Sequence, residues 1–353
     1  MSDTRHPTTI QRIHCKSTGV ALVVALAAAS TEAASFDCHR ARTHTELTIC
    51  ESPKLSGLDE RMALDYSRAL RALSPAGAGA LKKSQRSWLH FVTQVCASPE
   101  AQGNGDTAER CLVRKFNGRL AELAQAGIRL GPYVFNRIDS YAARRSPDGD
   151  RDGSDSGFVT QHVGYPQIDS PRNAATNAWN AMQVQGLKVN RNDDEDEDAD
   201  HIVETTLGCV GADIISTETI SSQYTHGTPH GVYDRTTGNQ VLSPVLRDMT
   251  ASDVFSADSG WLERMPSLFW EAYLRTHDAK ENPPSVEEII REAAPKPDAW
   301  LLTPAGLQIS FSAYEAGCYA CTPGPITVPW SAIKPMLATP DLATCKAPPA
   351  ASR

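Results

Sequence analysis

Between residues 43 and 123, apolar residues recur at intervals of three and four, a spacing that predicts amphipathic helices. We expect four short helices, near 43–50, 56–73, 81–96 and 112–123. Thr43 or Thr45 would cap the first and Ser56 the second, and Gly127 would follow the last. Four helices in about 90 residues bury only a marginal core. This unit, residues 35–127, is therefore expected to be a small all-α domain that needs covalent support.

The pattern changes in the second half of the chain. Segments rich in β-branched residues predict strands at 158–165, 201–207, 214–224, 231–235, 300–302, 307–311 and 326–328, with a turn at 236–239. Helices are expected at 171–185, 261–277 and 285–292. Strands and helices do not alternate strictly, which favours an α+β domain at 158–345 over a doubly wound sheet. A tail, 346–353, would follow.

The region between these units has few apolar residues. Residues 144–157 (RRSPDGDRDGSDSG) are rich in turn formers, so 128–157 is expected to be a linker or exposed loop. DGDRDG resembles the start of a calcium loop, but Val159 stands where a bidentate glutamate is needed. A turn-rich linker is the favoured interpretation, and calcium binding stays open.

The N-terminus has the pattern of a secretory leader. Three basic residues precede an apolar run at 19–29, and small residues at Ala33 and Ala34 offer cleavage sites, so residues 1–34 are expected to be a signal peptide. The run is well short of the roughly 20 residues needed to span a bilayer. We therefore expect a periplasmic or secreted protein without a membrane span after cleavage, and leave the choice between cuts after Ala33 and Ala34 open.

Export to an oxidising compartment would favour disulfide bonds between the cysteines. Removal of Cys15 with the leader leaves eight, an even set that favours disulfides in an oxidising compartment. The candidates are Cys38, Cys50, Cys96, Cys111, Cys209, Cys318, Cys321 and Cys345. The local pairs 38–50 and 96–111 are favoured in the helical unit, but the spacing does not decide the connectivity. The CxxC at 318–321 lacks the strand-to-helix context of a redox site, so structural disulfides are expected there too.

The net charge of the chain indicates which kinds of partner it can bind. The net charge is −8 for the whole chain, and removal of the leader makes the mature chain more acidic by one unit. Such a chain is not expected to bind nucleic acid. The acidic run, which includes Asp193, Asp194, Glu195, Asp196, Glu197 and Asp198, is expected to be a solvated loop that can attract a cationic partner.

Other polar residues are candidates for a site. His226 and His230 are four apart, but the glycines and proline of THGTPHG exclude a helix, so a structural histidine in a turn is favoured over a metal site. In the helical unit, Glu46 and Arg86 could pair, and Gln85 and Trp88 could form a binding edge; core and capping roles are favoured. No catalytic, metal or cofactor set is identified, so the chain is not expected to be an enzyme.

The helical unit resembles a known family. SFDCHRARTHTELTIC (35–50), LSGLDERMALDY (55–66), LKKSQRSWL (81–89) and the pair Cys96 and Cys111 are similar to the N-terminal domain of LprI-type lysozyme inhibitors. The resemblance implies a helical, disulfide-bonded, non-catalytic module. This chain departs from LprI itself in lacking the lipoprotein anchor.

The second unit carries a different resemblance. YPQIDSP with NAWN (165–180), QYTHGTPHG with TGNQVLSP (223–244), and the segment from 300 onwards resemble the region shared by the sensor RsiV and a peptidoglycan deacetylase. In RsiV this kind of domain binds lysozyme, so the resemblance implies a binding domain. The departures here are the acidic insertion and the cysteines at 318 and 321.

These observations lead to one functional hypothesis and one alternative. The hypothesis is an exported, non-catalytic protein that binds a protein partner, lysozyme, and inhibits it by steric capture. The alternative is a cell-envelope protein that binds peptidoglycan or another envelope protein, unrelated to lysozyme. The sequence does not reveal the contact residues or the oligomeric state.

Overall fold

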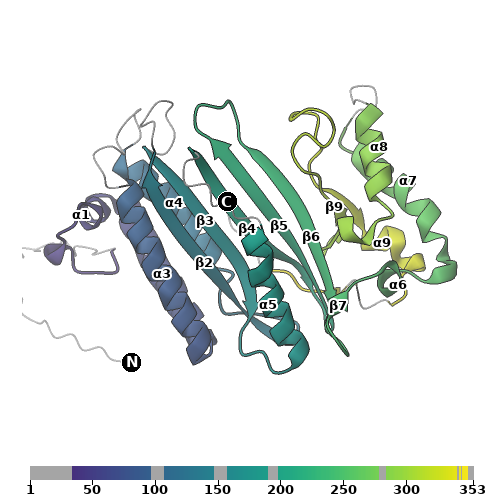
Figure 1. Cartoon of the computed structure of the whole chain (residues 1–353). Coiled ribbons are helices and arrows are strands. Elements are labelled where there is room, and N and C mark those ends of the chain that lie inside the picture. The colour runs from purple at the N-terminus through teal and green to yellow at the C-terminus, as the bar shows by residue number, and fades with distance from the viewer. Residues whose placement is uncertain are drawn as a thin grey trace, which may run out of the picture. The chain divides into compact units, whose positions relative to one another are not determined.

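The computed structural model describes residues 34–96, 107–146, 157–189, 198–277, 284–339, 342 and 344–348. They comprise an N-terminal helical region with disulfides and a C-terminal domain with a large mixed sheet (Figure 1). The expected multidomain fold class is confirmed. Within these residues, every helix is too short or too polar to cross a bilayer. Residues 1–33 of the expected leader and the DGDRDG segment lie outside the described residues.

The helical region begins with a 3₁₀ turn, Cys38–Arg40, and continues with α1 (His44–Glu51), α2 (Pro53–Ala72), α3 (Pro75–Cys96) and α4 (Ala108–Leu123). Helix α2 starts earlier than predicted. Its N-cap is Ser52, and Pro53 occupies the first turn, where its fixed φ suits a helix and its missing N–H costs nothing. Ser56 lies inside the helix, and its hydroxyl donates to the Ile49 carbonyl at 2.8 Å.

Both local disulfides of this region are formed. Cys38–Cys50 ties the first turn to α1, and Cys96–Cys111 joins the end of α3 to α4. The core between the helices is apolar, and the Trp88 and Phe116 rings meet edge to face at 5.1 Å. In the entropic model, closing a loop of about 15 residues contributes roughly 3 kcal/mol, a large share of the stability of so small a core.

The central sheet has seven strands in the order β1-β2-β3-β4-β5-β6-β7. Their bounds are β1 Ile128–Leu130, β2 Tyr133–Arg145, β3 Phe158–Ile168, β4 Ala199–Val210, β5 Ile214–Thr225, β6 Val232–Val241 and β7 Arg247–Asp248. All neighbours are antiparallel except β3 and β4, which are parallel and connected through α5 (Ala174–Val189). Trp179 of α5 is fully buried and contacts Phe135 of β2, with ring centroids 6.0 Å apart.

The C-terminal part packs a second core against the end of this sheet. It contains α6 (Ala251–Val254), α7 (Trp261–Leu274), α8 (Pro284–Ala293), α9 (Trp330–Ile333) and a sheet of β8 (Trp300–Leu302), β9 (Gly306–Ile309) and β10 (Ile326–Pro329). The remaining disulfides of the described residues, Cys209–Cys345 and Cys318–Cys321, lie here. Residues 236–239, expected as a turn, lie inside β6. Gly238 allows the close approach that this pairing needs, because a Cβ there would lie 2.8 Å from Thr217 Oγ1.

The segment expected to be a linker contains two strands of the sheet. Strand β2 pairs with β3 from Phe135↔Ile168 to Arg145↔Phe158. The exposed-loop prediction is wrong for 128–145, whereas 147–156 lie outside the described residues. The strand was missed because Arg137 and Asp139 interrupt its apolar alternation, yet both are buried. The predicted division into domains remains a prediction.

The helical region packs directly on this strand. The Phe91 ring of α3 stacks on Tyr141 of β2 with centroids 5.5 Å apart, and Gln94 Nε2 donates to the Ala143 carbonyl at 3.3 Å. Phe158, the first residue of β3, belongs to the apolar core of the helices. The helices therefore share a core with the sheet.

A buried ion network crosses the same contact. Asp139 lies 2.8 Å from Arg137 Nε, 3.0 Å from Arg119 Nη1 of α4 and 3.2 Å from His162 Nε2. Burial alone would raise the pKa of Asp139, but Arg137, the His162 hydrogen bond and Arg119 outweigh it and hold that pKa well below its usual range. Asp139 is therefore ionised, and its ion pairs with Arg119 and Arg137 connect α4 to strand β2.

Replacing Arg119 by methionine should strongly destabilise the protein. Asp139 would lose one of its two guanidinium partners in a buried site, and the change should lower the free energy of unfolding by roughly 3 kcal/mol or more. Arg86→Met is the matched control, because Arg86 is exposed on α3, and it should change stability by no more than about 0.5 kcal/mol. Urea unfolding of both variants measures the difference. Equal effects would contradict the role assigned to the network.

Candidate functional site

A pocket of about 460 Å³ opens on the helical region. The chain before the first disulfide and all four helices contribute to its wall. Its apolar lining consists of Phe36, Ile49, Met62, Ala63, Tyr66, Leu89, Val92 and Phe116, and its polar lining of Ser35, Thr43, Thr45, Glu46, Asp59, Gln85 and Thr93. An apolar floor with a few polar groups is typical of a binding site rather than of a packing defect.

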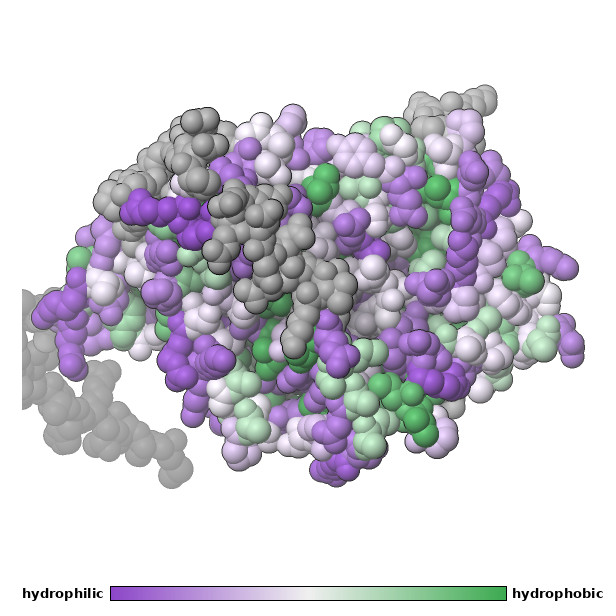
Figure 2. Space-filling model, viewed as in Figure 1, coloured by the Kyte–Doolittle hydropathy of each residue, from purple (hydrophilic) through white to green (hydrophobic). Residues whose placement is uncertain are grey.

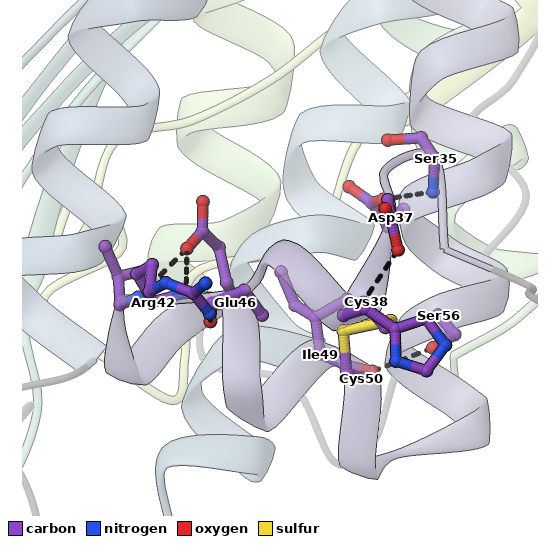
Figure 3. The surroundings of a disulfide bond; sticks show 12 residues. Ser35, Asp37, Cys38, Arg42, Glu46, Ile49, Cys50 and Ser56 are labelled. Carbon is purple, nitrogen blue, oxygen red and sulfur yellow. Dashed lines mark hydrogen bonds between the residues drawn. A yellow bond between two sulfur atoms is a disulfide. The ribbon is translucent and has the colours of Figure 1, made fainter.

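Helix α1, which contributes to the pocket wall, begins with a capping box. The Glu46 carboxylate accepts the backbone N–H groups of Arg42 and Thr43 at 2.8 and 2.9 Å, while Thr43 Oγ1 accepts the N–H of Glu46 at 3.2 Å (Figure 3). These backbone bonds, from Thr43 and then Arg42, lower the pKa of Glu46. Glu46 therefore caps the helix and is not available as the partner of Arg86.

The other helical candidates have structural roles. Trp88 is in the core, as favoured from the sequence. Gln85 lines the pocket, and its Oε1 accepts a bond from Arg119 Nε at 2.9 Å. Arg86 is exposed and forms no ion pair with any described residue.

An exposed leucine lines the pocket, and a second lies on α1. Leu89 lines it and is 47% exposed, and Leu47 on α1 is 45% exposed. Elsewhere, polar residues dominate the face in Figure 2, and apolar residues form small separate patches.

The acidic run is described only at its last residue. Asp193, Asp194, Glu195, Asp196 and Glu197 lie outside the described residues. Asp198 turns towards His226, whose Nδ1 lies 3.1 Å from Asp198 Oδ1 and whose Nε2 lies 3.4 Å from Asp200 Oδ2. His226 thus sits between two carboxylates with its side chain buried, and it does not share a site with His230.

His230 belongs to an aromatic cluster where the β5–β6 hairpin meets the loop that contains Cys318 and Cys321. Its ring stacks on Tyr319 with centroids 4.0 Å apart, and its Nε2 lies 3.2 Å from the Tyr314 hydroxyl. Tyr319 and Tyr314 are both exposed, and Tyr314 has a φ of +65°, a backbone conformation that costs energy for a tyrosine. The loop is fixed by the 318–321 disulfide and by the Ala313 N–H, which donates to the Tyr233 carbonyl at 2.8 Å.

One cluster has the geometry of a metal site. Glu122, Asp139 and His162 carry ligand atoms that all lie within 4.8 Å of one another. Asp139 is already bonded to the guanidinium groups of Arg119 and Arg137, whose positive charges repel a cation. Burial and the charge of Asp139 raise the pKa of Glu122, which weakens it further as a cation ligand. The donor set fits an ion network better than a metal centre.

Sequence reasoning missed Arg119, Asp139 and Asp59. A signal existed for Arg119, because it follows Phe116 by three residues and therefore lies on the apolar face of its helix. Asp59 likewise falls between Leu55 and Met62 on the inner face of α2, where the pattern predicts an apolar residue. The pocket itself had no signal, since it arises from packing between helices.

One comparison with known proteins bears on the helical region. The family model of the lysozyme inhibitor LprI matches residues 38–126. No curated protein matches the chain.

Two solved structures are similar to the chain, both of DUF3298 family proteins. The one from Bacteroides fragilis is 16% identical, with coverage of 61% of this chain and 98% of that chain and a TM-score of 0.39. The one from Pseudomonas aeruginosa is 12% identical, with coverage of 60% and 96% and a TM-score of 0.39. The family match covers the disulfide-bonded helices and the pocket between them, so residues 38–126 are similar to the lysozyme inhibitor LprI over the whole helical region.

Proposed function

We propose that this protein binds lysozyme through its helical domain and inhibits it by steric occlusion, without covalent chemistry. The observation that carries the proposal is the match of residues 38–126 to the family of the lysozyme inhibitor LprI. The disulfides of the described residues support a location outside the cytoplasm, where lysozyme acts.

The pocket supports the proposal and suggests the contact surface. Leu89 is exposed in the wall of a pocket of about 460 Å³, so a partner that covers it gains the burial of apolar area. The wall that carries Leu89 is α3, which also packs on β2. A rigid, preorganised surface loses little conformational entropy on binding.

Leu89→Asp should weaken lysozyme binding at least tenfold, about 1.4 kcal/mol, because it places a charge inside the contact. Leu262→Asp is the matched control: Leu262 is 57% exposed, but it lies on α7, away from the helical domain. Binding is measured by surface plasmon resonance, and inhibition by the rate at which lysozyme lyses cell walls. The proposal fails if the wild-type mature protein, in molar excess, neither retains lysozyme nor slows lysis.

We further propose that the acidic run steers a basic partner towards the protein. Changing Asp193, Asp194, Glu195, Asp196 and Glu197 to their amides should lower the association rate at low salt and leave the dissociation rate nearly unchanged. Asp198 is left intact, because it pairs with His226 inside the fold. Stopped-flow association at several salt concentrations tests this, and an unchanged salt dependence would contradict it.

A second candidate function, binding of peptidoglycan, is favoured by the aromatic cluster of His230, Tyr314 and Tyr319. Rigid exposed aromatic rings offer flat faces against which the C–H faces of sugar rings stack. Tyr319→Ala should then reduce co-sedimentation with purified cell wall several-fold and leave lysozyme binding unchanged. Retained sedimentation of the variant, or no sedimentation of the wild type, would remove this candidate.

A further inference from the structure

Asp59 is a buried carboxylate without a cationic side chain. It lies on α2 in the wall of the helical-domain pocket and is 8% exposed. Its Oδ2 accepts the backbone N–H of Ser35 at 2.7 Å. Within the described residues, no lysine, arginine or histidine forms an ion pair with it. A buried carboxylate that lacks a cation is costly, so a positive charge is expected near this oxygen.

The nitrogen that reaches Asp59 belongs to the residue after the expected leader. Hydrolysis of the Ala34–Ser35 peptide bond adds one water, leaves a carboxylate on Ala34 and frees the Ser35 nitrogen as an amine. The amine takes up a proton, because an α-amino group has a pKa of roughly 7.7 to 8. The same atom that donates a neutral hydrogen bond in the uncut chain then carries a full charge.

The neighbouring residues hold Ser35 in this position. The Asp37 carboxylate accepts the His39 N–H at 3.0 Å and caps the first turn, and the Cys38–Cys50 disulfide fastens that turn to α1. Phe36 packs against the core of the helices. The chain around Ser35 is therefore anchored by contacts of Phe36, Asp37 and Cys38, the residues that follow it.

We propose that cleavage between Ala34 and Ser35 creates an α-ammonium group that forms an ion pair with Asp59 and completes the wall of the pocket. A cut after Ala33 would place the ammonium one residue away, about 3.5 Å along the chain, and leave an amide at Asp59. Glu46, the other carboxylate in the pocket lining, is already bonded to the backbone of Arg42 and Thr43. Asp59 is thus the carboxylate left for the new N-terminus.

The first test is the N-terminus of the exported protein. The full-length gene product is recovered after export, and its first residue is read by intact mass and N-terminal sequencing. A chain that begins at Ser35 supports the inference. A chain that begins at any other residue overturns it.

The second test is a double-mutant cycle on the full mature chain. Proteins that begin at Ser35, or with one extra alanine before Ser35, are prepared with Asp59 or with Asp59→Asn. The extra alanine should lower the midpoint of thermal unfolding by a few degrees in the Asp59 protein and leave the Asn variant unchanged. Equal shifts in both backgrounds would overturn the ion pair.

A third measurement does not require the Asn variant to fold. The α-amine of the protein that begins at Ser35 should react several-fold more slowly with an acylating reagent near neutral pH than the α-amine of the protein extended by one alanine. The ion pair favours the protonated form of the amine, and only the unprotonated form reacts. Equal reactivity would contradict the inference. None of these measurements involves lysozyme, so their failure and the failure of the proposed function are distinguishable.

Discussion

Two arginines share one buried carboxylate at the contact between the helices and the sheet. Arg119 comes from α4, whereas Arg137 and Asp139 come from β2. Three charges removed from water are costly unless each is paired, and here each guanidinium finds further acceptors: Arg119 in Glu122 and Gln85, and Arg137 in Glu204. Because the partners lie on different elements, the network is satisfied only when α4 and β2 are correctly placed. The position of the helical domain depends on this requirement.

The network also reaches the pocket. Gln85 bonds to Arg119 on one side and lines the pocket on the other, so the buried charges fix a side chain of the candidate binding surface. The disulfides act at the opposite end of the helices, where Cys38–Cys50 and Cys96–Cys111 restrain the chain. The core of so small a domain stabilises it only marginally, and the ion network and the disulfides add the restraint that the core lacks. This rigidity suits a protein that acts by occlusion, since a preformed surface loses little entropy on binding.

The two candidate surfaces lie in different parts of the chain and differ in chemistry. The helical pocket offers apolar area with a few polar groups, whereas the aromatic cluster at Tyr319 offers flat exposed rings. The strained backbone of Tyr314 belongs to the second surface, where a disulfide and a backbone hydrogen bond keep it in place. We propose different partners for the two surfaces, a protein for the pocket and a glycan for the aromatic cluster, and the experiments above separate these roles.

The sequence by itself determined the helices, the set of cysteines available for disulfides and the resemblance of the helical region to LprI, whereas the structure decided which cysteines pair. The features that the sequence determined depend on residues close together in the chain: periodic apolar positions, caps such as Thr43, and cysteines separated by short loops. Only the tertiary structure decided that β2 is a buried strand, that Asp59 faces the nitrogen of Ser35, and that a pocket lies between the helices. The physical reason is the same in each case. Arg137 and Asp139 look like exposed residues in the sequence, and the partner of Asp59 cannot be read from it, because the groups that pair with these side chains come from distant parts of the chain.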